Sequence, residues 1–271
     1  MARAGLNIQV NPFGIVFNPI CLAHSIKRLV DGNEYVESEL IHDQGRFHSL
    51  DHHGRFSAES ADESIEKVNV EFLKAVANLS ATNVIIVTLG SAWAYQHLGT
   101  GKIAANCHRI PHQEFEKILV KSDRVFSELG AAINLMSGVC ESLQVVLTVS
   151  PVRHWKDGAI QNQVSKSHLR IACDELSSSF SNCHYFPAYE LVLDELRDYR
   201  FYADDMLHPS LQTVEFIWEK FQVATMSDSL IDRNTQIEKL RKVTDHQSDS
   251  KEHQERLAGA ERKITSILGK D

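Results

Sequence analysis

The sequence predicts an α/β protein built on a doubly wound, mostly parallel sheet. Two apolar runs resemble buried strands: residues 83–90 (NVIIVTLG) and 143–151 (LQVVLTVSP). Both are rich in β-branched residues, carry no charge and stop at Gly or Pro, as expected of parallel strands covered by helices on both faces. Helical patterns lie between such runs, and this alternation favours right-handed β-α-β crossovers.

Two further strands and four helices complete the predicted set. Residues 182–190 are a third candidate strand, and residues 6–10 are a fourth. A capping box opens the first helix, with Ser60 as N-cap and Glu63 three residues later, and this helix runs to residue 79. Apolar residues at three- and four-residue steps predict the other helices, over residues 113–136, over 160–180 and from Pro209 onward, where proline suits a first helical turn.

Length and composition indicate one domain with an appendage. The chain has 271 residues, of which 43% are hydrophobic, and this size suits a single α/β domain. We predict that residues 1–226 form this domain and that residues 227–271 form a charged C-terminal helical arm. A polar stretch breaks the arm near residues 245–251, and we expect the arm to pack on the domain or on a partner.

Charge and motif content exclude several classes of protein. The net charge is −8 and no Lys/Arg-rich run occurs, so a general nucleic-acid binder is not expected, although one or two arginines could hold a small anionic substrate. No apolar segment has the length of a signal-peptide core or a membrane span, which predicts a cytoplasmic protein. The histidine-rich stretch 41–56 fits no tetrahedral ligand spacing, so no metal or other cofactor is expected. The five cysteines are scattered and form no ligand motif, which predicts reduced, mostly buried thiols.

Chemistry in an open α/β sheet gathers at the carboxyl ends of its strands. Four stretches have that position: residues 10–19, 89–95, 150–155 and 204–210. The last contains Asp205 and His208, whose three-residue spacing in a turn lets the carboxylate orient the imidazole as a base. The alternative is that Asp205 caps a helix and His208 is a surface residue.

The stretch 89–95 places Gly90 and Ser91 directly after a strand. Ser91 could be a nucleophile, an N-cap or part of an oxyanion site, and we expect a structural or oxyanion-side role because no Gly-x-Ser-x-Gly elbow is present. Asn106 is a candidate donor to an oxyanion. Its neighbours Cys107 and His108 form a conceivable nucleophile pair, but adjacent side chains in a strand face opposite ways.

Residues 150–155 supply Arg153, His154 and Trp155, which suit an anion clamp and an aromatic wall. A solvated loop is the alternative.

Taken together, these stretches resemble the GSCFA-domain family, bacterial proteins related to the SGNH/GDSL hydrolases. The resemblance extends over most of the chain and rests on the order of its motifs, which are NPFGIVFNPI, FHSLDHHGRFS, VTLGSAWAY, ANCHRIP, LTVSPVRHWKDGAIQNQVSK and YFPAYELVLDELRDYRFYADDMLHPS. It implies a flavodoxin-like three-layer α/β/α sandwich and hydrolysis of ester bonds, acyl esters of carbohydrates among them.

The resemblance also implies roles for individual residues. Asp205 and His208 match the Asp-x-x-His block, and Gly14 and Gly90 match glycines of the oxyanion blocks. The asparagine expected after Gly90 is missing, and Asn106 is a candidate replacement. The family's Gly-Ser-Cys-Phe-Ala stretch, which carries the expected nucleophilic serine, is absent upstream of residue 11, so we expect the first strand to be missing and turnover to be lost or impaired.

Three hypotheses therefore stay open on the sequence. The first is an N-terminally truncated ester hydrolase with His208 as base and Asp205 as its orienter. A variant makes Ser91 the replacement nucleophile. The third is a non-catalytic module that binds a carbohydrate-like or anionic ligand with Trp93, Arg153 and His154.

Overall fold

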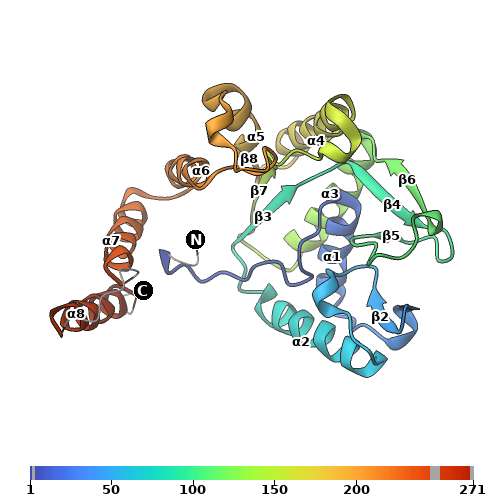
Figure 1. Cartoon of the computed structure of the whole chain (residues 1–271), viewed down its shortest axis with the longest axis horizontal. Coiled ribbons are helices and arrows are strands. Elements are labelled where there is room, and N and C mark those ends of the chain that lie inside the picture. The colour runs from blue at the N-terminus through green and yellow to red at the C-terminus, as the bar shows by residue number, and fades with distance from the viewer. Residues whose placement is uncertain (2–3, 245–250, 269–271) are drawn as a thin grey trace. The chain divides into compact units, whose positions relative to one another are not determined.

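A computed structural model describes residues 1, 4–244 and 251–268 (Figure 1). The chain divides into two compact units. The larger unit comprises residues 11–214, and the smaller unit joins residues 1–10 to residues 215–271. The boundary that the sequence places after residue 226 stays a prediction.

The larger unit is built on a parallel sheet of three strands in the order β3-β7-β8. These strands are β3 (Val84–Leu89), β7 (Gln144–Val149) and β8 (Cys183–Tyr185). In-register parallel pairing joins β3 to β7 along the whole length of both strands. The two strands predicted over 83–90 and 143–151 are therefore confirmed, and the protein is α/β with a parallel sheet.

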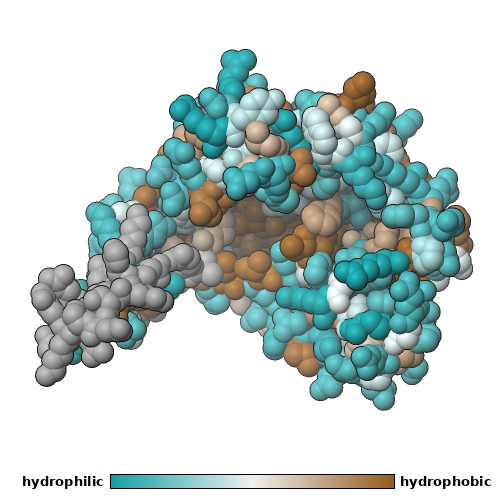
Figure 2. Space-filling view, in the orientation of Figure 1, coloured by the Kyte–Doolittle hydropathy of each residue, from teal (hydrophilic) through white to brown (hydrophobic). Residues whose placement is uncertain are grey.

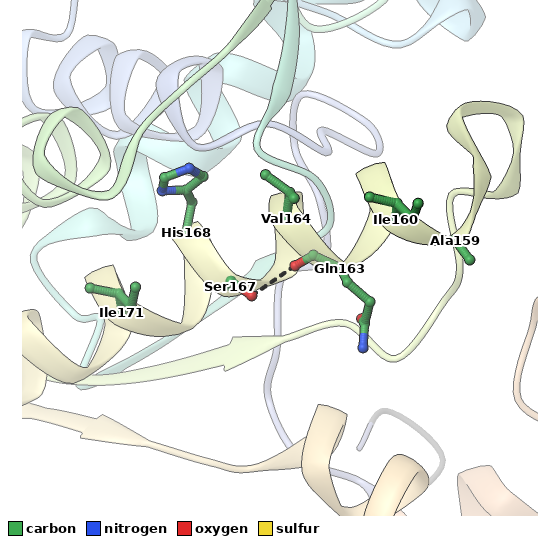
Figure 3. A pocket seen from close by; sticks show the side chains of 7 residues that line it. All are labelled: Ala159, Ile160, Gln163, Val164, Ser167, His168 and Ile171. Carbon is green, nitrogen blue, oxygen red and sulfur yellow. Dashed lines mark hydrogen bonds between the residues drawn. The ribbon is translucent and has the colours of Figure 1, made fainter.

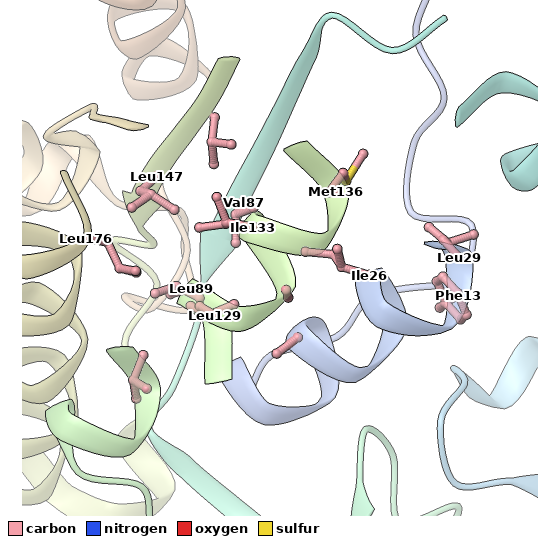
Figure 4. Packing of buried hydrophobic residues seen from close by; sticks show 14 of the residues in the cluster. Phe13, Ile26, Leu29, Val87, Leu89, Leu129, Ile133, Met136, Leu147 and Leu176 are labelled. Carbon is pink, nitrogen blue, oxygen red and sulfur yellow. The ribbon is translucent and has the colours of Figure 1, made fainter. Parts of the chain in front are cut away.

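Four helices build the hydrophobic core with one face of this sheet (Figure 4). Val87 and Leu89 of β3 and Leu147 of β7 point into it, and all three are almost completely buried. Residues of one strand alternate between the two faces of a sheet, so this face holds every second residue of β3 and β7. The helices are α1 (Pro19–Asp31), α2 (Ala61–Leu79), α3 (Ser122–Ser137) and α4 (Gly158–Ser179).

The opposite face of β3 is open. Val84 and Ile86 lie on it and are 54% and 38% exposed. Within the described residues, β3 also pairs with β7 alone, so its second edge has no strand beside it. Figure 2 shows brown, apolar side chains in a hollow over the region where Figure 1 draws β3. An exposed apolar edge strand of this kind is a site where another strand can pair.

An antiparallel sheet is inserted between β3 and α3, and it corrects one prediction. Residues 113–136 were expected to form a single helix, but their first part is β6 (Phe115–Leu119). β6 pairs with β4 (Trp93–His97), and β4 also pairs with β5 (Ile103–Ala104). The apolar residues Phe115, Ile118 and Leu119 fit a helical period, but cross-strand pairing decides their conformation.

The other predicted elements have mixed outcomes. In α2, the Ser60 hydroxyl accepts a hydrogen bond from the Glu63 N–H at 3.3 Å, which confirms the N-cap, and α4 confirms the helix over 160–180. Residues 6–10 do not form a strand, because no partner strand lies beside them in the described residues. Of the third candidate strand, over 182–190, only β8 is extended. It is followed by α5 (Ala188–Glu190) and by a π-helix over Leu191–Leu196.

The remaining elements are short or lie toward the C-terminus. Helix α6 (Leu211–Thr225) begins two residues after Pro209. The predicted arm contains α7 (Asp228–Thr244) and α8 (Lys251–Leu268), and most of its predicted break falls outside the described residues. A hairpin of β1 (Leu40–Asp43) and β2 (Arg46–Ser49) follows α1, and 3-10 turns cover Glu37–Glu39, Gly54–Phe56, His112–Glu114, Trp155–Asp157 and Tyr199–Phe201.

Two expectations from composition can be compared with the structure. All five cysteines are free thiols, and only Cys107 is not buried. In the part of the chain that the structure describes, no helix is both long and apolar enough to cross a bilayer.

Replacing Leu129 tests the packing of α3 in the core. Leu129 is fully buried, so Leu129→Ala is expected to lower the free energy of unfolding by about 2–5 kcal/mol, as is typical of Leu→Ala substitutions at buried positions. Leu135→Ala on the exposed face of the same helix is the control and is expected to change it by less than about 0.5 kcal/mol. Urea unfolding followed by circular dichroism measures both, and equal losses would contradict the assigned face of α3.

Candidate functional site

The candidate site lies where β3 and β7 end, at Gly90 and Ser150. Carboxyl ends of neighbouring parallel strands meet at one edge of a sheet. Loop residues 150–155 follow β7, and the turn with Asp205 and His208 joins this loop through a hydrogen bond from the Arg153 N–H to the Leu207 carbonyl at 3.2 Å.

Asp205 and His208 form an oriented pair. His208 Nδ1 lies 2.6 Å from Asp205 Oδ2, and the N–H groups of Leu207 and His208 donate to Asp205 Oδ1 at 2.8 and 2.9 Å. The backbone hydrogen bonds from His208 and Leu207, followed by the imidazole, lower the pKa of Asp205 to about 2. An ionised carboxylate can only accept, so Nδ1 carries the proton and Nε2 of the neutral ring is free to take one.

Local backbone geometry holds this turn. The Ala203 N–H donates to the His208 carbonyl at 2.7 Å, and the Met206 N–H donates to the Ala203 carbonyl at 2.9 Å. Met206 adopts a φ of 60°, a left-handed conformation that costs free energy in a non-glycine residue and is found where surrounding contacts enforce it. The His208 side chain is nevertheless 61% exposed, so its ring can reach a ligand from solvent.

Gly90 lies in close contact with Phe17, which leaves little room for a side chain. A Cβ at Gly90 would lie 3.2 Å from both the Phe17 ring and the Phe17 carbonyl. That carbonyl accepts hydrogen bonds from the N–H groups of Gly90 and Ser91 at 3.0 and 3.1 Å. Both N–H groups predicted on the oxyanion side are therefore occupied in this structure.

Ser91 belongs to a buried hydroxyl network. Its side chain is almost completely buried, its Oγ lies 3.3 Å from Ser165 Oγ, and it accepts a hydrogen bond from the Trp93 N–H at 3.0 Å. Among the described residues, no imidazole bonds to this hydroxyl. This arrangement matches the structural role that the sequence favoured, while the nucleophile variant stays an untested prediction.

His154 lies beside Gly90 and the Asp205–His208 pair. Its ring packs edge-on against the Phe17 ring with 5.9 Å between the ring centres, and its backbone N–H donates to Asn162 Oδ1 at 3.0 Å. Burial lowers the pKa of His154, and the positive charge of Lys166 lowers it further, against a hydrogen bond to the Gly90 backbone. The His154 imidazole is therefore expected to be neutral near pH 7.

Lys166 is a residue of this site that the sequence reasoning missed. Its side chain is 1% exposed, and Nζ donates to the carbonyls of Gly90 and Ser150 at 2.6 and 2.7 Å. No carboxylate pairs with Nζ among the described residues, and burial lowers the pKa of Lys166 to about 7. The sequence does indicate that Lys166 is buried, because it lies on the same face of α4 as the apolar residues Leu169 and Cys173.

The other residues predicted to line a ligand have separate contacts. The guanidinium of Arg153 lies over the Tyr202 ring at 4.7 Å. Lys117 Nζ lies 4.4 Å from the centre of the Trp93 ring and also forms an ion pair with Asp157. Trp155 is largely exposed.

Gly14 and Asn106 lie elsewhere. The Gly14 N–H donates to the Asn11 carbonyl at 2.8 Å, and a Cβ at Gly14 would clash with His53 at 2.2 Å. Asn106 Oδ1 accepts from the His108 N–H at 2.8 Å. No contact joins Gly14 or Asn106 to the Asp205–His208 pair in the described part of the chain, so their predicted oxyanion roles have no geometric support here.

These two residues border a buried histidine cluster. His52 Nδ1 bonds to Ser49 Oγ at 2.7 Å, and His108 Nε2 donates to the Ser49 carbonyl at 2.7 Å, while His48 stacks on His108 at 4.8 Å. Burial lowers the pKa of His52 to about 3 and of His108 to about 4. Within the described ranges, no three His, Cys, Asp or Glu side chains converge as metal ligands. Neutral imidazoles thus serve here as hydrogen-bonding links in the core.

A separate pocket lies on the outer face of α4 (Figure 3). One helix supplies every residue that lines it, and most of these side chains are apolar. Because no second element faces them, we do not assign a ligand site there. The lining residues are Ala159, Ile160, Gln163, Val164, Ser167, His168 and Ile171.

Comparison with known proteins yields one match. A protein-family model described as the GSCFA family matches residues 1–221. No curated protein and no solved structure matches the chain.

The histidine cluster predicts acid sensitivity. The pKa values of His52 and His108 in the folded chain lie below the usual value of 6.5. The unfolded chain therefore binds more protons below pH 6.5, and stability is lost as pH falls toward 4, by about 2 kcal/mol for each histidine at pH 5. Urea unfolding at pH 7.5 and pH 5 measures the loss. His52→Phe should reduce this loss, and exposed His24→Gln should leave it unchanged. The same loss of unfolding free energy in the parent chain and in both variants would refute the assignment.

Lys166 predicts a change in the same direction at higher pH. Its pKa falls from 10.5 to about 7 on folding, so the unfolded chain binds more protons between these values and stability from this group rises with pH. Lys166→Met should reduce the difference in unfolding free energy between pH 7 and pH 9 by about 1–2 kcal/mol. Exposed Lys156→Met is the control. An unaltered difference in Lys166→Met would show that the lysine keeps its ordinary pKa in the fold.

Proposed function

The chain belongs to the GSCFA family, and from that premise we propose that it is an ester hydrolase of the SGNH/GDSL type. Its substrates would be acyl esters, with carbohydrate esters as one class. The parallel sheet would then be part of a flavodoxin-like three-layer sandwich. His208 acts as general base and Asp205 orients it.

The observation that supports this proposal most is the oriented imidazole. Asp205 is ionised and holds Nδ1 of His208 at 2.6 Å, while Nε2 has no partner among the described residues. Such a ring can take the proton of a serine hydroxyl, and the carboxylate then stabilises the imidazolium. The serine oxygen forms a bond to the ester carbonyl carbon, the alcohol leaves with the proton from His208, and water releases the acid from the acyl-enzyme.

The nucleophile is expected on a strand that pairs with the open edge of β3. That edge lacks a neighbour in the described residues, and the adjacent face exposes Val84 and Ile86. A parallel strand added there would end beside Gly90, and therefore beside His154 and the Asp205–His208 turn. Its residues on that face would lie beside Val84 and Ile86 and extend the same apolar face.

The alternative is a non-catalytic module that keeps the cleft for ligand binding. One observation favours it: the Ser91 hydroxyl and the N–H groups of Gly90 and Ser91 are already engaged in structural hydrogen bonds. The described residues then offer a base and cationic groups but no free serine nucleophile at the strand ends.

Labelling with a serine-reactive fluorophosphonate separates these hypotheses. We expect the chain to remain unlabelled, and a chain extended by upstream in-frame codons for an apolar strand and serine to be labelled at that serine. An in-frame stop codon directly upstream of Met1 would overturn this proposal in favour of the binding module. Labelling that is lost in Ser91→Ala would instead identify Ser91 as the nucleophile.

In a labelled, active chain, His208→Gln is expected to lower kcat/KM for p-nitrophenyl acetate by about 10²–10⁴-fold, because the serine loses its general base. Asp204→Asn is the matched control, since Asp204 is exposed and adjacent to the orienting carboxylate but forms no described contact with His208. An active His208→Gln variant would remove His208 from the mechanism.

A further inference from the structure

The arrangement of charged groups around the Asp205–His208 turn identifies a property of the ligand. We infer that Arg153 binds an anionic group, a carboxylate or a phosphate, on the molecule that occupies this site. The inference deepens the proposed function by naming a substrate class, anionic esters. Anion binding itself does not require that the chain hydrolyse anything.

Arg153 carries an unused set of hydrogen-bond donors. Its guanidinium lies face-on over the Tyr202 ring at 4.7 Å, so the ring supports one face of the plane and leaves the N–H edge available. Within the described residues, no carboxylate or carbonyl accepts a hydrogen bond from this guanidinium, although the side chain is half-buried. A planar guanidinium fork of this kind matches the two oxygens of a carboxylate or phosphate.

Tyr202 adds a second unused donor. Its hydroxyl is buried and has no hydrogen-bond partner among the described residues. A buried hydroxyl without a partner is destabilising, so such groups are uncommon unless a ligand or water satisfies them. The guanidinium of Arg153 and the hydroxyl of Tyr202, which belong to one pair of contacting side chains, are thus both without a hydrogen-bond acceptor among the described residues.

The backbone places Arg153 next to the proposed base. Its N–H donates to the Leu207 carbonyl at 3.2 Å, and the next residue along the chain is His208. Tyr202 pairs with Pro209 in an antiparallel bridge on the other side of the turn. The backbone of Arg153 and the Arg153–Tyr202 contact are therefore both joined to the turn that carries His208.

The nearby acids do not pair with Arg153. Asp205 is held by His208, Asp157 pairs with Lys117, and Glu190 pairs with Arg170 at 2.8 Å. The buried Nζ of Lys166 donates hydrogen bonds to two backbone carbonyls and has no carboxylate partner among the described residues. The guanidinium of Arg153 is therefore left without an acidic partner in the part of the chain that the structure describes, although the whole chain has a net charge of −8. A guanidinium of this kind favours anionic ligands.

Titration calorimetry of the full chain with inorganic phosphate, and separately with malonate, tests the inference. We expect at least one of the two anions to bind, and comparison of the two identifies the preferred group. Arg153→Gln should weaken binding at least tenfold, and Tyr202→Phe, which keeps the ring under the guanidinium, should weaken it to a smaller extent. Arg153→Lys keeps the charge, loses the planar fork, and should fall between the parent and Arg153→Gln.

Arg200→Gln is the matched control, because Arg200 also lies over an aromatic ring, Phe201, but has Asp198 3.9 Å away. It should bind both anions like the parent chain. His208→Gln should also keep anion binding, whereas in a labelled, active chain it lowers hydrolysis, so failure of the proposed function and failure of this inference give different results. No binding of either anion, or equal binding by the parent and a folded Arg153→Gln or Arg153→Lys, would overturn the inference.

Discussion

One buried ammonium group holds the carboxyl ends of the two longest parallel strands together. Lys166 donates to the carbonyls of Gly90 and Ser150, the first residues after β3 and β7. Burial of an ion without a carboxylate partner is unfavourable, and these carbonyl hydrogen bonds offset part of that cost. The position of Gly90 in turn determines where Phe17 can pack, and Phe17 occupies the N–H groups of the following turn.

The sequence predicted the parts of the fold that local pattern determines. Buried β-branched runs identified β3 and β7, and Ser60 identified the start of α2, because both signals act within a few residues. The β4–β6 sheet was missed because Phe115 and Leu119 satisfy a helical spacing, and only pairing with a distant strand gives them an extended conformation. The same limit applies to residues 6–10, whose apolar pattern has no neighbouring strand in the described residues.

The candidate site was predicted in part, for a related reason. The three-residue spacing of Asp205 and His208 in one turn is local information, and their hydrogen bond is present. Gly14 was grouped with them through the family resemblance, and Asn106 as a candidate donor to an oxyanion, but both border the histidine cluster instead. Lys166 lies on the buried stripe of α4, and its role emerges only when β3 and β7 are placed beside that helix.

The central claim is that the turn at residues 205–208 presents an imidazole whose tautomer is set by an ionised carboxylate. Nitrogen-15 NMR of the histidine side chains in the full chain at pH 8 tests it most directly, with Asp205→Asn to assign the His208 signal. For the neutral form of the His208 ring, the geometry predicts a proton on Nδ1 and none on Nε2. A ring protonated on Nε2, or one that exchanges freely between both forms as in a surface histidine, would contradict it.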